Sequence, residues 1–363
     1  MLAAACTTSR PSGNAAGEPV AAAPAAASAV PVGPAQPDSV PVPKKTIGLL
    51  QYVGASYVQK QLTDELVRAA TALGWDVVVK DGQGQPALIA ASAQAFVQSN
   101  VDAFVSIANP PSAIQASLQA FHDRGTPIIG VAGIVQDPGG FFDAILRPSD
   151  AIQGAMAADY LEESLAPGST IVAQRLDGLL GVKIRADAFT SGMDNYGFAT
   201  VATHQMDVSN LVSDTISSVR DQLTANPKAA AVYSSIDSQF GPICNLLNER
   251  GQTSVKVLAM YTFPDTVKAL QTCPNGVIID SPNWWTGWQA VDILLHHWTK
   301  NAPFSAAAET AKYPYPYVVV TRDTMPPDLP SYPFEDLGAT LYSAWKAEGY
   351  HLAPLAPPTV ATR

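Results

Sequence analysis

The sequence predicts an α/β protein made of two lobes, each containing a parallel sheet. Short apolar runs alternate with longer amphipathic segments over residues 46–321, which is the pattern of buried parallel strands joined by crossover helices. The alternation occurs as two successive units of similar length, and the second starts near residue 170. A chain of 363 residues is long enough to give each unit a core of its own.

The first unit opens with an apolar run and closes at a helix cap. Its predicted strands are residues 46–53, 75–79, 101–107 and 127–131. Amphipathic segments that end near residues 73, 99 and 124 separate these strands and are predicted to be helices. Gly125 ends the third helix, and Ser149 or Asp150 suits the N-cap of the next one, residues 151–165.

The second unit repeats this order. Its predicted strands are residues 170–174, 199–203, 229–233, 255–260, 277–279 and 315–321. Helices are predicted to end near residues 195, 226, 250 and 271, and a tryptophan-rich amphipathic helix follows at 285–301. Residues 326–363, which begin with a proline-rich stretch, are expected to form a C-terminal extension.

The first 43 residues are expected to be a lipoprotein-like leader and a tether. Small residues precede Cys6, as in a bacterial lipidation signal, although the basic and apolar signal regions are missing and Ala3 replaces a larger aliphatic residue. Residues 7–42 are almost entirely Ala, Pro, Gly, Ser and Val, a composition that cannot build a core. We expect Cys6 to carry a lipid; the alternative is an incidental cysteine in an alanine-rich leader.

The composition excludes several classes of function. The net charge of -10 and the lack of a basic run argue against a nucleic-acid partner. No apolar stretch reaches the roughly 18 residues of a membrane span. The chain has no glycine-rich phosphate loop, paired-cysteine metal motif or nucleophile elbow, and its five histidines are scattered. We therefore expect a protein that is not an enzyme and that holds no metal or cofactor.

Cys244 and Cys273 are the other two cysteines of the chain. In an exported protein the oxidising compartment makes a disulfide between them plausible. The alternative is two unpaired cysteines that pack as small apolar side chains.

The order of the strand-end motifs resembles that of periplasmic solute-binding proteins of the ribose-binding type, the receptors of bacterial ABC importers for sugars and related solutes. The resemblance covers roughly residues 44–321. The matching features are IGL at 47–49, DGQGQP at 81–86, VDAF at 101–104, ANP at 108–110, GTPII at 125–129, Ser149-Asp150 ahead of Gly154, and Gly241.

This resemblance implies two Rossmann-like lobes joined by a three-segment hinge, with a ligand trapped as the lobes close. Crossings are expected near residues 147–149, 281–283 and 307–312. The first lobe would comprise residues 44–148 and 283–309, and the second lobe residues 149–282 and 310–325. The implied partners are a small sugar, polyol or derivative, an ABC permease, and the membrane through the lipid anchor. The protein would act as a monomer outside the cytoplasm, on the outer face of the cell membrane.

The resemblance also points to residues that could hold the ligand. Members of this family grip a sugar with polar side chains and cover its apolar surface with aromatic rings. The matching positions here are Tyr52, Tyr57, Asn109, Lys183, Ser235, Asp237, Tyr261, Asp280, Asn283 and Trp284. Six of them have a structural alternative: Tyr52 and Tyr57 at the edge of the core, Asn109 in a turn, Lys183 in solvent, Asp237 as a helix cap, and Trp284 packed at the hinge.

Two positions depart from the family pattern in a way that bears on the ligand. Ala132 and Tyr261 stand where sugar-binding aspartates normally end a strand. The expected pocket is therefore less acidic and more aromatic, suited to a small polyol, a modified sugar or a partly apolar ligand. The alternative function is a lipoprotein that senses a modified or partly aromatic small molecule and signals to a membrane receptor. A transcriptional repressor with this sensor fold is disfavoured, because the tether occupies the place of its DNA-binding domain.

Overall fold

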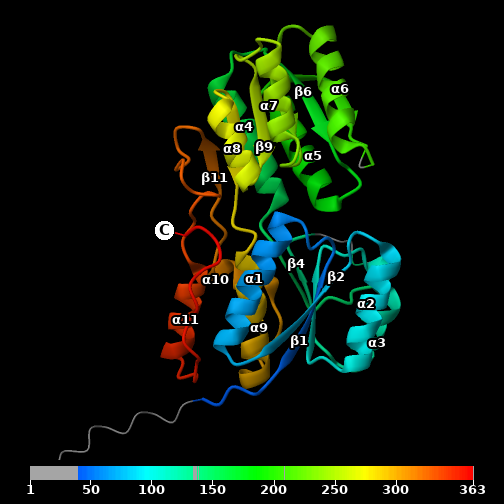
Figure 1. Cartoon of the computed structure of the whole chain (residues 1–363), viewed down its shortest axis with the longest axis vertical. Helices are drawn as coiled ribbons and strands as arrows, with labels where there is room; N and C mark the ends of the chain where they lie inside the picture. The colour runs from blue at the N-terminus through cyan, green and yellow to red at the C-terminus, as the bar shows by residue number, and fades with distance from the viewer. Residues whose placement is uncertain (1–39, 134–136, 138, 208, 363) are drawn as a thin grey trace, which may run out of the picture. The chain divides into compact units, whose positions relative to one another are not determined.

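A computed structural model describes residues 40–133, 137, 139–207 and 209–362. Cys6 and nearly all of the tether lie outside these residues. The described chain forms two lobes, each built on one sheet, and we refer to them as the first lobe and the second lobe (Figure 1). The predicted α/β class with parallel sheets in two lobes is confirmed.

The first lobe contains a five-stranded parallel sheet in the order β2-β1-β3-β4-β5. Its strands are β1 (Thr46–Gln51), β2 (Asp76–Asp81), β3 (Ala103–Ile107), β4 (Ile128–Val131) and β5 (Ala144–Leu146). Helices cover both faces, which is why the central strands β1, β3 and β4 are buried along almost their whole length. Figure 1 shows α1 (Tyr57–Ala72) and α9 (Trp285–Lys300) on one face, and α2 (Pro86–Ser99) and α3 (Pro111–Asp123) on the other.

The second lobe contains a six-stranded sheet in the order β11-β10-β9-β8-β6-β7, in which only the edge strand β11 is antiparallel to its neighbour. Its strands are β6 (Thr170–Arg175), β7 (Ala199–Gln205), β8 (Ala229–Ser234), β9 (Lys256–Met260), β10 (Gly276–Asp280) and β11 (Val318–Thr321). One face packs against α4 (Asp150–Ser164) and α5 (Leu180–Asn195). The other packs against α6 (Leu211–Ala225), α7 (Phe240–Glu249) and α8 (Pro264–Thr272).

Helices α4 and α5 approach each other closely at Gly154. A Cβ atom at this position would lie 2.1 Å from the carbonyl oxygen of Arg185, so a larger residue would push the helices apart. This contact holds α4, which follows the first crossing between the lobes, against the helix that carries Arg185.

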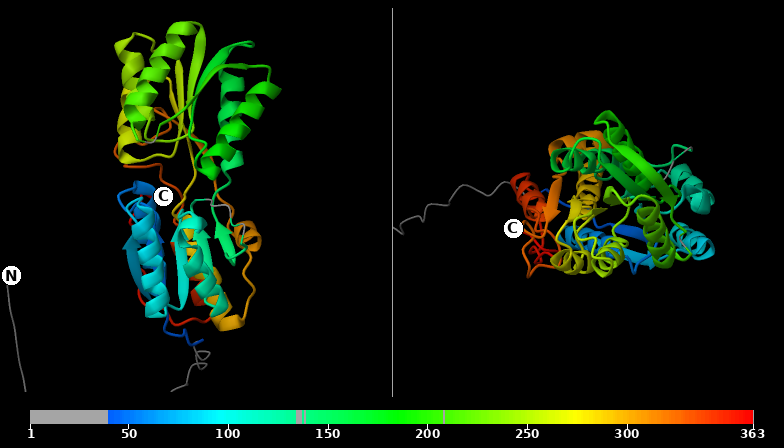
Figure 2. Two further views of the ribbon diagram at one scale, coloured as in Figure 1. Left: turned by 90° about the vertical axis from the view of Figure 1, so that its right-hand side faces the viewer. Right: turned by 90° about the horizontal axis from the view of Figure 1, so that it is seen from above.

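The chain passes between the lobes at residues 147–149, 281–284 and 313–317 (Figure 2). The first and third crossings touch, because the backbone N–H of Ser149 donates to the hydroxyl of Tyr317 at 2.5 Å. The third crossing was expected near residues 307–312, and it lies directly after them. Those residues belong to α10 (Ala306–Lys312), which begins at a Ser305 cap and packs beside β5 in the first lobe.

The segment predicted as a C-terminal extension is built into the first lobe. Helix α11 (Leu337–Ala347) packs against α9 and α1, and Trp345 is fully buried in the core that they share. The last residues of the tether are also attached here, because the N–H of Val40 donates to the carbonyl of Gly349 at 2.8 Å. The first lobe is therefore larger than the sequence pattern indicates.

In the second lobe, a disulfide joins Cys244 in α7 to Cys273, which follows α8. Among the described residues no helix is both long and apolar enough to cross a membrane. The same residues contain no group of three or more His, Cys, Asp and Glu side chains placed to hold a metal ion.

Candidate ligand site between the lobes

The loops that follow the strands of the two sheets carry left-handed backbone at residues other than glycine. Ala108 follows β3 with φ 56°, Ala132 follows β4 with φ 60°, and Tyr261 follows β9 with φ 61°. Residues other than glycine rarely adopt left-handed backbone angles, and those that do concentrate at functional sites. The carboxyl ends of parallel strands are also where ligands bind in this kind of sheet. Backbone strain and topology therefore point to the same edge of each sheet.

Asn109 follows the strained Ala108 and is fully buried. Its Nδ2 donates to the Leu50 carbonyl at 2.9 Å and also reaches the Ser106 hydroxyl and the Ile107 carbonyl at 3.2 Å. Its Oδ1 has no partner among the described residues. The amide thus ties β1 to β3 through its nitrogen and leaves an acceptor unused.

The two tyrosines of the first loop have different surroundings. Tyr52 packs against the core between the first sheet and α2 and α3, as in the structural alternative for this residue. Tyr57, at the start of α1, crosses to the second lobe and packs against Phe263 with ring centroids 5.1 Å apart. Tyr57 is therefore the tyrosine that borders the junction between the lobes.

Arg185 organises the corresponding region of the second lobe. Its guanidinium is buried and donates to the Ser235 carbonyl at 2.9 Å, to Asp150 Oδ1 at 2.6 Å and to the Tyr261 hydroxyl at 2.7 Å. Burial lowers the pKa of Arg185, but Tyr261 and Asp150 more than offset this effect, so the pKa is raised and the charge persists. The hydroxyl of Tyr261 in turn donates to Gln153 at 3.1 Å.

The same network accommodates a tyrosine, Tyr261, directly after β9, at the position where the resemblance to the solute-binding family implies an aspartate. Its ring lies 5.0 Å from the Arg185 guanidinium, an attractive cation–π geometry. Burial raises the pKa of Tyr261, so its hydroxyl stays neutral. The partners of the Arg185 guanidinium include one carboxylate, that of Asp150, and its Nε has no partner among the described residues. Tyr261 contributes an aromatic wall.

The remaining candidates of the second lobe serve the framework or face solvent. Ser235 is fully buried, and its hydroxyl accepts the N–H of Leu176 at 3.1 Å. Lys183 is half-exposed and pairs with Asp187 one turn further along α5. Asp237 is partly buried, and burial raises its pKa. The N-cap of α7 is Gln239, and it makes no side-chain cap hydrogen bond.

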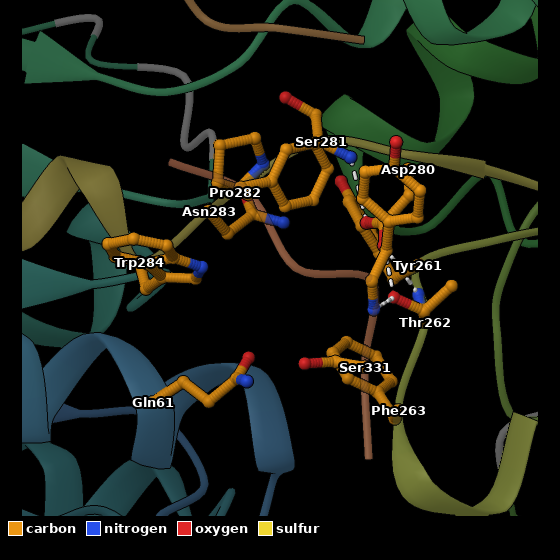
Figure 3. A pocket seen from close by; sticks show the side chains of 12 residues that line it. Gln61, Tyr261, Thr262, Phe263, Asp280, Ser281, Pro282, Asn283, Trp284 and Ser331 are labelled. Carbon is orange, nitrogen blue, oxygen red and sulfur yellow. Dashed lines mark hydrogen bonds between the residues drawn. The ribbon is translucent and has the colours of Figure 1, made fainter. Parts of the chain in front are cut away.

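A small hollow lies where the first lobe, the second lobe and the second crossing meet (Figure 3). Figure 3 shows the Gln61 side chain of α1 directed into the hollow from one side, with Trp284 and Thr262 on opposite flanks. It is lined by Gln61, Tyr261, Thr262, Phe263, Asp280, Ser281, Pro282, Asn283, Trp284, Ser331, Tyr332 and Phe334. The space inside the hollow is about 20 Å³, enough for about one water molecule, so it can hold a solute only if the two lobes move apart.

Asp280 is the carboxylate of this hollow and is almost completely buried. It accepts the backbone N–H of Thr262 at 3.0 Å, the hydroxyl of Thr262, and the backbone N–H of Ser281 at 2.7 Å. Burial outweighs these hydrogen bonds and raises the pKa of Asp280 to about 7. The second crossing is therefore fixed to the end of β9 by a carboxyl group that titrates near neutral pH.

Of the residues expected at the site, the structure brings Tyr261, Asp280, Asn283 and Trp284 together around the hollow. Tyr57 adjoins it through Phe263. Tyr52, Asn109, Lys183, Ser235 and Asp237 do not line it. Sequence reasoning missed Gln61 on the second turn of α1 and the three residues from the C-terminal segment, because only tertiary contacts bring them here. Phe263 could have been found, since it follows β9 directly.

Residues 47–302 match the family described as periplasmic binding protein domain. This match covers more than half of the chain, and the chain therefore belongs to that family. The ribose import binding protein RbsB of Escherichia coli is 21% identical over 210 residues, which are 58% of this chain and 70% of that protein. The RbsB protein of Salmonella typhimurium matches with the same identity over 211 residues.

Solved structures share the fold at low sequence identity. A periplasmic ribose ABC transporter protein from Conexibacter woesei has a TM-score of 0.70 at 14% identity, covering 79% of this chain and 94% of that one. A solute-binding protein from Agrobacterium vitis with bound allitol has a TM-score of 0.65 at 16% identity, covering 79% and 97%. These relatives are described as import binding proteins or as solute-binding proteins of ABC transporters.

Proposed function

We propose that this protein is the extracytoplasmic solute-binding receptor of an ABC importer, and that it captures a sugar-like or polyol ligand between its two lobes. The observation that carries the proposal is the hollow that both lobes and the second crossing line together, in a chain that belongs to the periplasmic binding protein family. A ligand held there would contact both lobes at once. Closure would then be a population shift driven by contacts that exist only when both lobes meet the ligand.

The chemistry of the lining supports a polyhydroxylated ligand with an apolar face. Asn283 and Ser281 offer groups that can both donate and accept hydrogen bonds. Trp284 and Phe263 offer ring faces that can cover C–H surface. Similar proteins are described as binding allitol, D-arabinose and 5-methylthioribose, ligands that combine these features in different proportions.

Anchoring, transport partner and location form part of the same proposal. Lipidation of Cys6 would hold the receptor on the outer face of the cell membrane, with the alanine- and proline-rich residues 7–42 as a tether. The closed form would dock as a monomer on a membrane permease. No catalytic step and no cofactor are required for this role.

The second candidate function is a lipoprotein that senses a modified sugar and signals to a membrane receptor. The aromatic lining favours it, because Tyr261 occupies a position at which an aspartate was expected and its ring adjoins Phe263. A ligand with an apolar substituent would bury more apolar surface against the rings of Tyr261 and Phe263 than an unmodified sugar would.

Thermal-shift screening against D-ribose, D-arabinose, D-tagatose, allitol and 5-methylthioribose, followed by calorimetry, tests the proposed function. At least one solute is expected to raise the unfolding temperature in a concentration-dependent manner. Asn283→Ala is expected to weaken its binding about tenfold, since one hydrogen bond in the hollow is lost. Asn195→Ala, at the exposed end of α5, is the control and should bind as the wild type does. If no neutral sugar or polyol stabilises the protein, the proposal fails.

A further inference from the structure

The C-terminal segment makes a fourth connection between the lobes. After β11 the chain packs Met325 into the core of the second lobe. The backbone N–H of Tyr332 then donates to the hydroxyl of Thr262 at 2.7 Å. Two residues further on, Phe334 is buried in the core of the first lobe. Residues 326–334 thus cross back from the second lobe to the first.

Beyond this crossing, the segment is attached firmly to the first lobe. Arg68 forms a two-pronged pair with Asp336, with nitrogen–oxygen distances of 2.9 and 2.8 Å. Glu65 is fully buried, and one of its oxygens accepts both the backbone N–H and the hydroxyl of Thr359 at 2.8 Å. Paired charges of this kind are stable inside a protein only with satisfied geometry. The segment therefore behaves as a permanent part of the first lobe.

Three residues of this fourth crossing, Ser331, Tyr332 and Phe334, line the hollow. Gln61 lines it from α1 of the first lobe, and Thr262 connects Tyr332 to the buried Asp280. Ser331 is itself almost completely buried, so its hydroxyl has little access to bulk water. The crossing lies outside residues 47–302, which match the family, so these contacts are additional to the matched domain.

The residues that line the hollow carry no positive charge. Its lining residues include no lysine, arginine or histidine, and Asp280 is their single carboxylate. A ligand phosphate or carboxylate would find no cation to pair with and would meet a carboxyl group instead. Ser331 and Gln61 can each donate and accept hydrogen bonds. The lining is therefore suited to neutral hydroxyl groups.

We propose that the fourth crossing is a specificity element of the receptor, in which Ser331 together with Gln61 contacts hydroxyl groups of a neutral ligand and the hollow rejects phosphorylated or carboxylated analogues. This inference rests on the proposed function. It adds to it a wall of the binding site that comes from the C-terminal segment, and a stated ligand class.

Calorimetry with a neutral sugar or polyol that binds the wild type tests the inference. Ser331→Trp, which fills the hollow, is expected to weaken binding at least about tenfold, and Ser331→Ala and Gln61→Leu about threefold to tenfold each through loss of a hydrogen bond. Ser343→Trp places the same side chain on the exposed face of α11 and should leave binding unchanged. The 5-phosphate of the same sugar should not compete at a hundredfold excess over the sugar.

The outcomes separate the inference from the proposed function. Wild-type affinity in a folded Ser331→Trp variant, or in both Ser331→Ala and Gln61→Leu, overturns the inference and leaves the receptor function standing. Competition by the sugar phosphate overturns the proposed ligand class. Ser331→Ala and Gln61→Leu decide the matter if the tryptophan variant does not fold. Absence of binding of any neutral solute to the wild type overturns both proposals.

Discussion

The ring of Tyr57 at the start of α1 packs against the ring of Phe263 in the second lobe, with centroids 5.1 Å apart and planes inclined by 58°. Phe263 lines the hollow, so Tyr57 supports one of the aromatic walls from behind. Aromatic pairs of this geometry contribute about 0.5–1.5 kcal/mol beyond the area that they bury.

Loss of this support should weaken ligand binding. Tyr57→Ala is expected to lower solute affinity about threefold to tenfold, whereas Tyr57→Phe keeps the ring contact and should bind as the wild type does. Calorimetry with the same solute measures both variants. Tyr196→Ala, which removes an exposed tyrosine after α5, is the control. Equal affinities for Tyr57→Ala and Tyr57→Phe would contradict this role of the ring.

Arg185, which lies beside the strand ends of the second lobe, is expected to contribute strongly to the free energy of unfolding. Removing one partner of a buried ion pair leaves the other charge uncompensated, at a cost of about 3–5 kcal/mol. Arg185→Leu is expected at the lower end, about 3 kcal/mol, because Asp150 keeps its contact with Arg147 at 2.8 Å. Urea unfolding measures the loss. Arg220→Leu, on the exposed side of α6, should change stability by less than about 0.5 kcal/mol. A similar small effect of Arg185→Leu would show that the network is not structural.

The sequence predicted the repeating part of the fold well, since each buried strand is a short apolar run whose meaning does not depend on distant residues. β3, for example, is buried at every position. It did not predict β5, which has only three residues, or α10, whose seven residues lie where a crossing between the lobes was expected. The sequence did not predict helix α11 either, because its apolar face is explained only by contacts such as that between Trp345 and Asp292, which are 53 residues apart.

The lining of the hollow could be predicted where a side chain follows a strand directly. Asp280 ends β10 and Tyr261 follows β9, and both line the hollow. Asn109 also follows a strand, yet its nitrogen is committed to the backbone of β1, and no sequence pattern distinguishes that use from ligand contact. Ser331 lies 70 residues beyond Tyr261 in a proline-rich stretch, so only the fold shows that the two share a wall.

The buried carboxyl of Asp280 predicts a pH dependence of stability. Its pKa is raised from 3.8 to about 7 by burial, so the folded protein keeps this proton while the unfolded chain releases it near pH 4. The protonated Asp280 therefore contributes its full stabilisation to the free energy of unfolding below pH 4, and this stabilisation is lost as the pH rises through 7. With 1.36 kcal/mol per pKa unit, the loss from this group is on the order of 4 kcal/mol.

Asp280→Asn is expected to reduce the fall in the free energy of unfolding between pH 5 and pH 8, because an amide stays neutral throughout. Urea titrations at these two pH values give the difference directly. Glu309, whose pKa burial raises to about 8, contributes in the same direction in wild type and variant, so it cancels from the comparison. Asp265→Asn, at an exposed position of α8, should keep the wild-type pH dependence. An unchanged slope in Asp280→Asn would refute this assignment.

The disulfide between Cys244 and Cys273 should contribute measurably to the stability of the second lobe. It closes a loop with a sequence separation of 29 residues, for which the chain-entropy account predicts about 3–4 kcal/mol. Cys244→Ala/Cys273→Ala is expected to lower the free energy of unfolding by that amount in urea, and dithiothreitol should lower that of the wild type similarly while leaving the double variant unaffected. Peptide mapping without reduction should recover the two cysteines in one linked fragment. Two free thiols at these positions, or equal unfolding midpoints for the oxidised wild type and the double variant, would show that the bond does not stabilise the protein.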